Sequence, residues 1–218
     1  AEELYIDLLA DPDARVRLAS IRGLEQIAGQ GYRRYQEAAA RLLADPETEV
    51  QLCVLPALLK AEDPALRTEA TAKLRVLLKS SAAHVRAQAL GVVGQAHNLG
   101  FLLELVGALT DSADEVRLAA GLATEVLAGD ELLAGNRDVL LALALLLLHD
   151  PLEPARLSAI TVLDRMSRES GPGATVALAS LAVGLGDPSF TVRERAVDAL
   201  ARVGRKAIPP VEEQLDAA

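Results

Sequence analysis

The fold is decided by a stretch that spans residues 187–196 and reads Asp-Pro-Ser-Phe-Thr-Val-Arg-Glu-Arg-Ala. Its outline is an Asp-Pro pair, a Val-Arg pair after a short gap, and a small residue three places beyond the arginine. The outline recurs, with substitutions, in six segments that begin at Asp11, Asp45, Ser80, Asp111, Asp150 and Asp187. The valine position advances by 34, 35, 31, 39 and 37 residues from one segment to the next. Self-similarity at such a period indicates an array of stacked repeats.

Each repeat is predicted to be a pair of helices. Proline disfavours helical geometry in the residue before it, so the Asp-Pro pair ends the first helix. The same pair is expected to start the second helix, with aspartate as the cap and proline in the first turn. Apolar residues then follow at helical spacing, as in Val16, Ile21 and Leu24. The predicted repeats cover residues 1–30, 31–62, 63–97, 98–130, 131–170 and 171–205, with a terminal helix in 206–218.

The Asp, Val and Arg positions resemble the signature of the HEAT-repeat family, in its short bacterial form. The resemblance extends over almost the whole chain. It implies an all-α protein, a right-handed α-solenoid of about six HEAT-like helical hairpins plus a terminal helix, forming a single domain over residues 1–218. In HEAT proteins the aspartates and arginines of neighbouring repeats form a hydrogen-bonded ladder. That structural role is carried over to Asp11, Arg17, Asp45, Arg86, Asp111, Arg117, Asp150, Arg156, Asp187 and Arg193.

Repeats two and three depart from this pattern. Gln51 stands at an arginine position and Ser80 at an aspartate position, so the ladder is expected to be weakest there. Pro56 lies inside the second helix of repeat two and removes one backbone hydrogen bond. A change of superhelical curvature is therefore predicted over residues 47–61.

The composition argues against several functions. The net charge is −9, whereas a nucleic-acid binder usually presents a basic face. No phosphate-binding loop, nucleophile elbow or zinc-ligand spacing is present in the sequence, so no catalytic, cofactor-binding or metal site is predicted. The histidines are interpreted as capping or solvent-exposed residues, and Cys53 as a small core residue. The longest apolar run, residues 139–148, is too short for a bilayer, which needs about 20 residues.

A partner is expected on the concave face, which the second helices line in a HEAT solenoid. The residue after each ladder arginine, and the residue one turn later, form an apolar row that suits a groove for an amphipathic helix or extended peptide. Burial of this row between adjacent helices is the alternative. The candidate partner-binding residues are Leu18, Leu52, Leu118, Leu122, Leu157, Arg22, Glu125 and Arg195.

Two further stretches are candidates for contact. The helix predicted within residues 136–149 is apolar on every face, so it should be covered by another domain or subunit, or by the loop 129–135. A basic cluster in the last repeat could bind an acidic partner, or could simply be a solvated end. This cluster contains Arg193, Arg195, Arg202, Arg205 and Lys206.

These features predict a non-enzymatic protein–protein interaction module or regulatory scaffold. The expected partner is a protein or a neighbouring domain of the same polypeptide, and no nucleic acid. The chain is expected to be a cytoplasmic piece of a longer bacterial protein. A close variant is the cytosolic regulatory domain of a membrane transporter or signalling protein. The alternative from another class is an enzyme component that resembles the HEAT-like phycobilin lyases.

Overall fold

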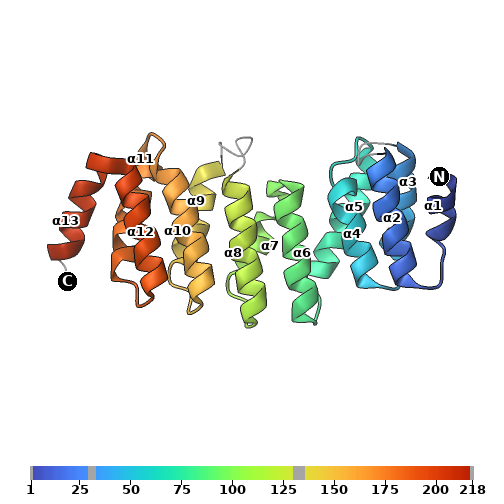
Figure 1. Cartoon of the computed structure of the whole chain (residues 1–218), viewed down its shortest axis with the longest axis horizontal. Coiled ribbons are helices and arrows are strands. Elements are labelled where there is room, and N and C mark those ends of the chain that lie inside the picture. Colours follow the sequence, from blue (N-terminus) through green and yellow to red (C-terminus); the bar gives the residue numbers. More distant parts are fainter. Residues whose placement is uncertain (1, 29–32, 130–135, 217–218) are drawn as a thin grey trace. The chain divides into compact units, whose positions relative to one another are not determined.

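The computed structural model describes residues 2–28, 33–129 and 136–216. Within these ranges the regular structure is entirely helical, and no residue lies in a strand (Figure 1). The prediction of an all-α fold is therefore confirmed.

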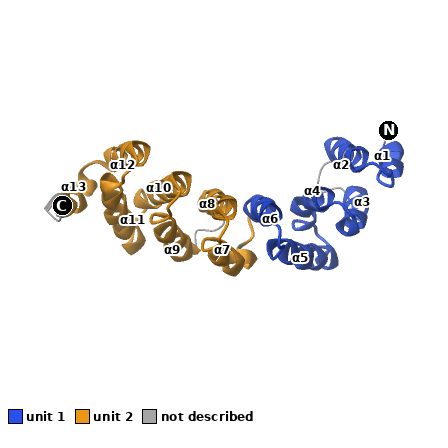
Figure 2. Ribbon diagram, turned by 90° about the horizontal axis from the view of Figure 1, so that it is seen from below, with its two compact units in different colours: residues 1–96 blue, residues 97–218 orange. Residues whose placement is uncertain are grey.

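The chain divides into two compact units, Ala1–Ala96 and His97–Ala218 (Figure 2). The division falls within one residue of the predicted boundary between repeats three and four, 97/98. That residues 1–218 form one continuous domain stays a prediction.

Unit 1 holds three helix pairs. Helices α2, α4 and α6 form one layer and α3 and α5 the other, while α1 lies against α2 (Figure 2). Its helices are α1 (Glu2–Leu8), α2 (Ala14–Ala28), α3 (Arg33–Arg41), α4 (Thr48–Leu58), α5 (Pro64–Leu78) and α6 (Ala83–Ala96). Helix α2 packs against α3 and α4, and α4 packs against α5 and α6. The interior contains fully buried Ile21, Leu55, Leu74 and Leu90.

Unit 2 repeats this two-layer arrangement, with α8, α10 and α12 in one row and α7, α9 and α11 in the other (Figure 2). The helices are α7 (Leu102–Ala108), α8 (Asp114–Ala128), α9 (Arg137–Leu147), α10 (Glu153–Ser167), α11 (Pro172–Val183), α12 (Phe190–Val203) and α13 (Ile208–Asp216). Short 3₁₀ turns, η4 (Gly184–Gly186) and η5 (Gly204–Ala207), precede α12 and α13. Helix α10 lies at the centre of the unit, against α8, α9, α11 and α12.

The predicted start of the second helices is wrong by two residues. The cap of α4 is Glu47, and Asp45 lies two positions earlier and accepts the Glu47 N–H at 2.9 Å. Asp150 and Asp187 each close the same turn onto the N–H two residues ahead, at 2.8 Å. Aspartate favours such turns because its side chain can bond the backbone two residues on. One carboxylate oxygen closes the turn, and the carboxylate can still receive an arginine from the neighbouring repeat.

The apolar helix of repeat five is covered within its own unit. Helix α9 packs against α8, α10 and α11, which bury Leu140, Leu143 and Leu147. Among its large apolar side chains only Leu146 is exposed. Cover from another domain or subunit is therefore not required, because an inner first helix is enclosed on several sides by its neighbours. Most of the loop 129–135 lies outside the described residues.

Pro56 lies inside α4, which ends two residues later at Leu58. The predicted change of curvature over residues 47–61 stays a prediction.

Candidate partner-binding face

The ladder arginine of repeat one joins two repeats of unit 1. Arg17 donates from Nε and Nη2 to the Asp45 carboxylate at 2.7 and 2.8 Å. Its Nη1 folds back onto the carbonyl oxygens of Asp11 and Pro12, at 2.8 and 3.1 Å. The hydrogen bonds from Arg17 hold the pKa of Asp45 below its ordinary value, against the effect of burial. Arg17 thus closes its own turn and binds the aspartate of the next repeat.

Unit 2 contains two steps of the same ladder. Arg117 reaches Asp150 at 2.9 Å, and Arg156 reaches both oxygens of Asp187 at 2.7 and 2.9 Å. Burial would raise the pKa of Asp187, but the hydrogen bonds from Arg156 and from the Ser189 N–H outweigh it and lower the pKa. Arg117 and Arg156 thus bridge neighbouring repeats of unit 2, with side chains that are largely buried.

The two exceptions to the ladder, Gln51 and Ser80, keep the hydrogen bonds of their own turns. Gln51 still donates to the carbonyl oxygen of Asp45, but its side chain is too short to reach a further repeat. Ser80 accepts the Ala82 N–H at 3.3 Å, as the aspartates do at their own turns. Arg86 folds back onto the Ser80 carbonyl oxygen at 2.7 Å.

A further fold-back arginine, Arg67 of α5, was missed by the sequence analysis. It donates to the carbonyl oxygens of Ala61 and Glu62, the second at 2.7 Å. The signal was present, because Arg67 follows Ala61 by six residues, as Arg17 follows Asp11. Alanine at the aspartate position concealed it.

The candidate row of leucines divides between core and surface. Leu18 and Leu52 are buried in unit 1, whereas Leu118 and Leu157 are half-buried in unit 2. Leu122, one turn later, is 52% exposed. The residue directly after the ladder arginine is thus largely buried between helices, whereas the residue one turn later is exposed in unit 2.

The charged candidates differ in their surroundings. Arg22 and Arg195 are exposed, and Glu125 is half-buried. Burial raises the pKa of the Cys53 thiol, and a hydrogen bond with Arg22 opposes that shift. The thiol is half-buried.

A second set of arginines links the helices of unit 2 near the far ends of α10 and α12. Arg165 donates from Nη1 to the Glu125 carbonyl oxygen of α8 at 3.0 Å. Arg202 of α12 donates to the Asp164 carboxylate of α10 at 2.9 Å. Each arginine reaches back to the preceding second helix, whereas the ladder arginines reach forward. The sequence carried a signal for this, because Arg165 and Arg202 both stand nine residues after a ladder arginine.

Asp164 joins two arginines, Arg168 and Arg202, beside Arg165. Its buried carboxylate also accepts from Arg168, and the side chains of Arg168 and Arg202 remain about half exposed. Gly129 leaves room for Arg165, since a Cβ there would lie 2.3 Å from Nη1 of that arginine. We call Arg165, Arg168 and Arg202 the arginine cluster. This cluster spans two repeats and shares Arg202 with the predicted cluster of the last repeat, which stays a prediction.

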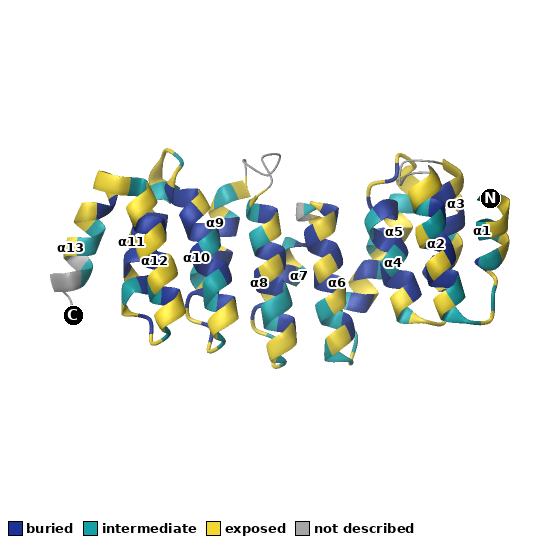
Figure 3. Ribbon diagram, viewed as in Figure 1, coloured by how far each residue is buried: buried dark blue, intermediate teal, exposed yellow. Residues whose placement is uncertain are grey.

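Apolar side chains continue this surface onto α8. Leu122 and Val126 are exposed, and Val126 directly follows Glu125, whose carbonyl oxygen receives Arg165. Figure 3 shows exposed positions on α8, α10 and α12 of unit 2. We call Leu122, Val126 and the arginine cluster together the binding face.

The described residues contain no cluster of three histidine, cysteine, aspartate or glutamate side chains placed to hold a metal ion. None of the helices in the described ranges is both long and apolar enough to cross a membrane.

Comparison with known proteins identifies the fold alone. No protein-family model matches the sequence, and no curated protein matches it. Among solved structures, a designed armadillo repeat protein in complex with the peptide (KR)4 is 20% identical, with a TM-score of 0.61 over 92% of this chain and 98% of that chain. Cex1p is 17% identical, with a TM-score of 0.65 over 100% of this chain and 44% of that chain. The chain therefore has the fold of the armadillo and HEAT-like α-solenoids.

Proposed function

We propose that this protein is a non-enzymatic binding module that holds a protein segment on the binding face of unit 2. The observation that carries the proposal is the continuity of exposed Leu122 and Val126 with the arginine cluster. Repeat solenoids of this fold commonly bind peptides and proteins on a surface formed by one layer of their helices.

The chemistry of the face specifies the segment. Leu122 and Val126 offer an apolar contact, and apolar side chains excluded from water at the centre of an interface contribute much of the affinity. The arginine cluster carries three positive charges, and Arg168 and Arg202 share the single negative charge of Asp164. Arginine is suited to planar, two-pronged recognition of carboxylates. The partner is therefore a segment in which an apolar residue lies next to aspartate or glutamate.

The positive charge of the arginine cluster favours an acidic segment over a basic one. The designed armadillo protein described above holds the basic peptide (KR)4. A basic peptide would be repelled by the arginine cluster, so we expect the present chain to select acidic segments instead.

A peptide selection tests this function. A random peptide library displayed on phage is panned against the full chain, and enriched peptides are measured by fluorescence anisotropy. We expect enrichment of acidic residues beside apolar ones, with binding weakened about tenfold or more by Leu122→Asp and by Arg165→Glu.

Leu103→Asp is the matched control. Leu103 is 86% exposed on α7, in the other layer of the same unit, so its replacement adds the same charge away from the binding face. Circular dichroism checks that all variants remain helical. Equal losses in Leu103→Asp and Leu122→Asp, or a selection without acidic residues, would contradict the proposal.

A further inference from the structure

The guanidinium groups of the arginine cluster are only partly used within the protein. Arg165 donates from Nη1 to the Glu125 carbonyl oxygen, and among the described residues its Nε and Nη2 have no hydrogen-bond acceptor. Arg202 donates to Asp164 through Nη2 alone, and Arg168 donates through Nε and Nη2. All three arginines are exposed. The cluster therefore presents N–H donors from three guanidinium groups to a ligand.

Two helices bring these donors together. Arg165 lies in the last turn of α10 and Arg168 directly follows that helix, so the two side chains lie three residues apart on one side of it. Arg202 lies in the last turn of α12 and reaches Asp164 of α10 at 2.9 Å. Asp164 is 7% exposed, so the carboxylate that holds Arg168 and Arg202 is itself fixed in the core.

The cluster keeps two positive charges after its internal pairing. Its three guanidinium groups face one carboxylate, that of Asp164, and no other carboxylate in the described part of the chain forms an ion pair with them. A ligand carboxylate has one charge and two oxygens, which a single guanidinium satisfies. A phosphorylated serine or threonine carries about 1.5 to 2 negative charges at pH 7 and offers three acceptor oxygens. The phosphoryl group therefore matches both the charge and the number of the arginines.

Acidic residues on the neighbouring helices favour one compact, doubly charged group over a run of carboxylates. Glu125 is half-buried on α8 directly before Val126, and Asp198 is exposed on α12 one turn before Arg202. A ligand with several successive acidic residues would meet these carboxylates, and opposed like charges weaken an interface. A single phosphoryl group delivers the same charge to the cluster alone.

The apolar part of the binding face favours a protein segment as the source of the phosphoryl group. Leu122 and Val126 are exposed beside the cluster and suit an apolar residue of such a segment. An inorganic phosphate ion has no group that makes this contact. An anionic lipid surface would repel a chain whose net charge is −9.

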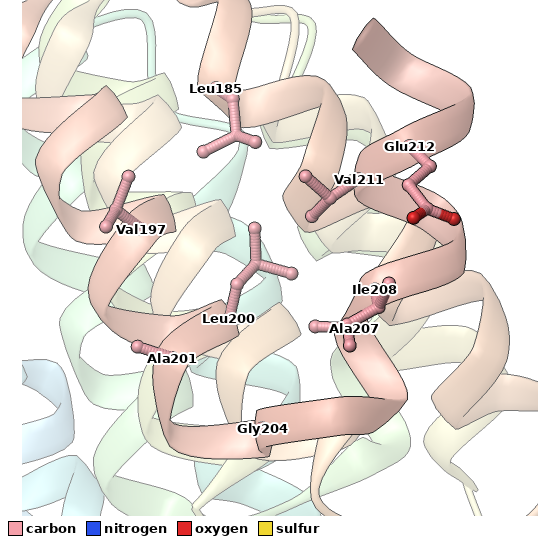
Figure 4. A pocket seen from close by; sticks show the side chains of 9 residues that line it. All are labelled: Leu185, Val197, Leu200, Ala201, Gly204, Ala207, Ile208, Val211 and Glu212. Carbon is pink, nitrogen blue, oxygen red and sulfur yellow. The ribbon is translucent and has the colours of Figure 1, made fainter. Parts of the chain in front are cut away.

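The apolar groove of the same unit does not suit a phosphoryl group. It encloses about 360 Å³ between α12, η4 and α13, with Leu200, Ile208 and Val211 among its lining residues (Figure 4). Of the described residues that line it, only Glu212 is charged, and its negative charge would repel a phosphate.

We propose that the arginine cluster binds a phosphorylated serine or threonine of the partner segment, whose apolar neighbour contacts Leu122 and Val126. Phosphorylation of the partner then switches its binding on, and aspartate or glutamate at the same position is a weaker substitute. This inference rests on the proposed function and specifies the acidic position of the segment.

Three peptide libraries test the proposal. Each has a fixed leucine followed by phosphoserine, glutamate or serine, with random residues on both sides, and each is screened on the immobilised full chain. Enriched phosphoserine peptides are synthesised again with each of the other two residues and measured by fluorescence anisotropy. We expect the glutamate form to bind at least about tenfold more weakly than the phosphoserine form, and the serine form at least about 100-fold more weakly.

Arg168→Gln in the protein separates the two kinds of ligand. It should weaken the phosphoserine peptide about tenfold and the glutamate peptide less than about twofold, because a carboxylate needs only the free Nε and Nη2 of Arg165. Arg15→Gln is the matched control, since it removes the same charge from the surface of unit 1 and should change neither affinity. Circular dichroism establishes that each variant is folded.

The outcomes distinguish this inference from the proposed function. If glutamate peptides bind as tightly as phosphoserine peptides, or Arg168→Gln weakens both equally, the inference is wrong and the proposed function stands. If no library yields a binder, both are wrong. The inference is also overturned if inorganic phosphate displaces the phosphoserine peptide at equal concentration, or if vesicles containing phosphatidic acid bind the wild type and not Arg165→Glu, because a lipid would then be the ligand.

Discussion

Replacing Arg156 by glutamine should separate the two contacts of a ladder arginine, the fold-back bond to its own turn and the pairing with the aspartate of the next repeat. Repeat two already contains this change at Gln51, where the side chain keeps the fold-back bond to its own turn and loses the reach to another repeat. Arg156→Gln should likewise retain a bond to the Asp150 carbonyl oxygen, which Arg156 now holds at 2.9 Å. What is lost is the two-pronged contact with Asp187.

The magnitude follows from the surroundings of the pair. Exposed ion pairs contribute about 0.5 kcal/mol, whereas removal of one partner from a fully buried pair costs about 3–5 kcal/mol. The side chains of Arg156 and Asp187 are 11% and 7% exposed, and Asp187 keeps its hydrogen bond from the Ser189 N–H. We expect the separation of α11 and α12 from α10 to become easier by about 2 kcal/mol.

Hydrogen exchange measured by mass spectrometry is the suitable assay, because it reports each helix separately. A change of about 2 kcal/mol corresponds to roughly 30-fold faster exchange. We expect that acceleration in peptides from α11 and α12, with no change in α2 to α4 of unit 1. Arg15→Gln is the control, since Arg15 pairs with Asp13 on the surface and its loss should leave exchange unaltered. Exchange in α11 and α12 as slow as in the wild type would refute the reasoning.

Three other predictions follow from local structure. The stabilising effect of the Arg17–Asp45 pair should be fully present above the ordinary aspartate pKa of 3.8. It should vanish as the pH falls through the lowered pKa of Asp45 in the folded state. The melting temperatures of wild type and Arg17→Gln should therefore differ at pH 7 and pH 5 and converge in stronger acid. Gly184→Ala should destabilise the protein by about 1–3 kcal/mol, because the new Cβ would lie 2.9 Å from Ile160 and 3.1 Å from Ala196. Gly107→Ala on α7 is the control, since its Cβ would meet no atom within 4 Å. Thermal denaturation should find Gly107→Ala neutral or slightly stabilising. Burial raises the pKa of Cys53, so its alkylation by iodoacetamide at pH 8 should be slower than that of free cysteine. Arg22→Ala should slow the alkylation further, because it removes a hydrogen bond that opposes the pKa shift. Unchanged or faster labelling of Arg22→Ala would contradict this origin of the shift.

The sequence predicted the helix pairs and the partners within the ladder because both depend on spacing that repeats. Arg17, Arg117 and Arg156 meet the aspartates of the next repeat as the resemblance to HEAT proteins implied. The exact helix starts were not predictable in the same way, since aspartate can serve as a helix cap or close the turn before the cap, and the Asp-Pro pair is compatible with both. Only the backbone conformation decides between them.

The candidate face was predicted less well, because exposure depends on neighbours that are distant in sequence. Leu18 and Leu118 occupy equivalent positions, yet Leu18 is buried and Leu118 is half-buried. The backward reach of Arg202 to Asp164 spans two repeats, and a pattern analysis confined to single helices could not reveal it. The uniform apolarity of α9 was misleading for the same reason, since its neighbours on several sides cover it.

The binding face is tested most directly by exchanging charge between it and its ligand. An acidic peptide selected on the wild type is compared, by fluorescence anisotropy, with the same peptide carrying lysine at its acidic position. Against the wild type, the acidic peptide should bind at least about tenfold more tightly, and against Arg165→Glu the preference should reverse in favour of the lysine peptide. If the wild type and Arg165→Glu show the same preference, the arginine cluster does not contact the ligand and the proposed binding face is wrong.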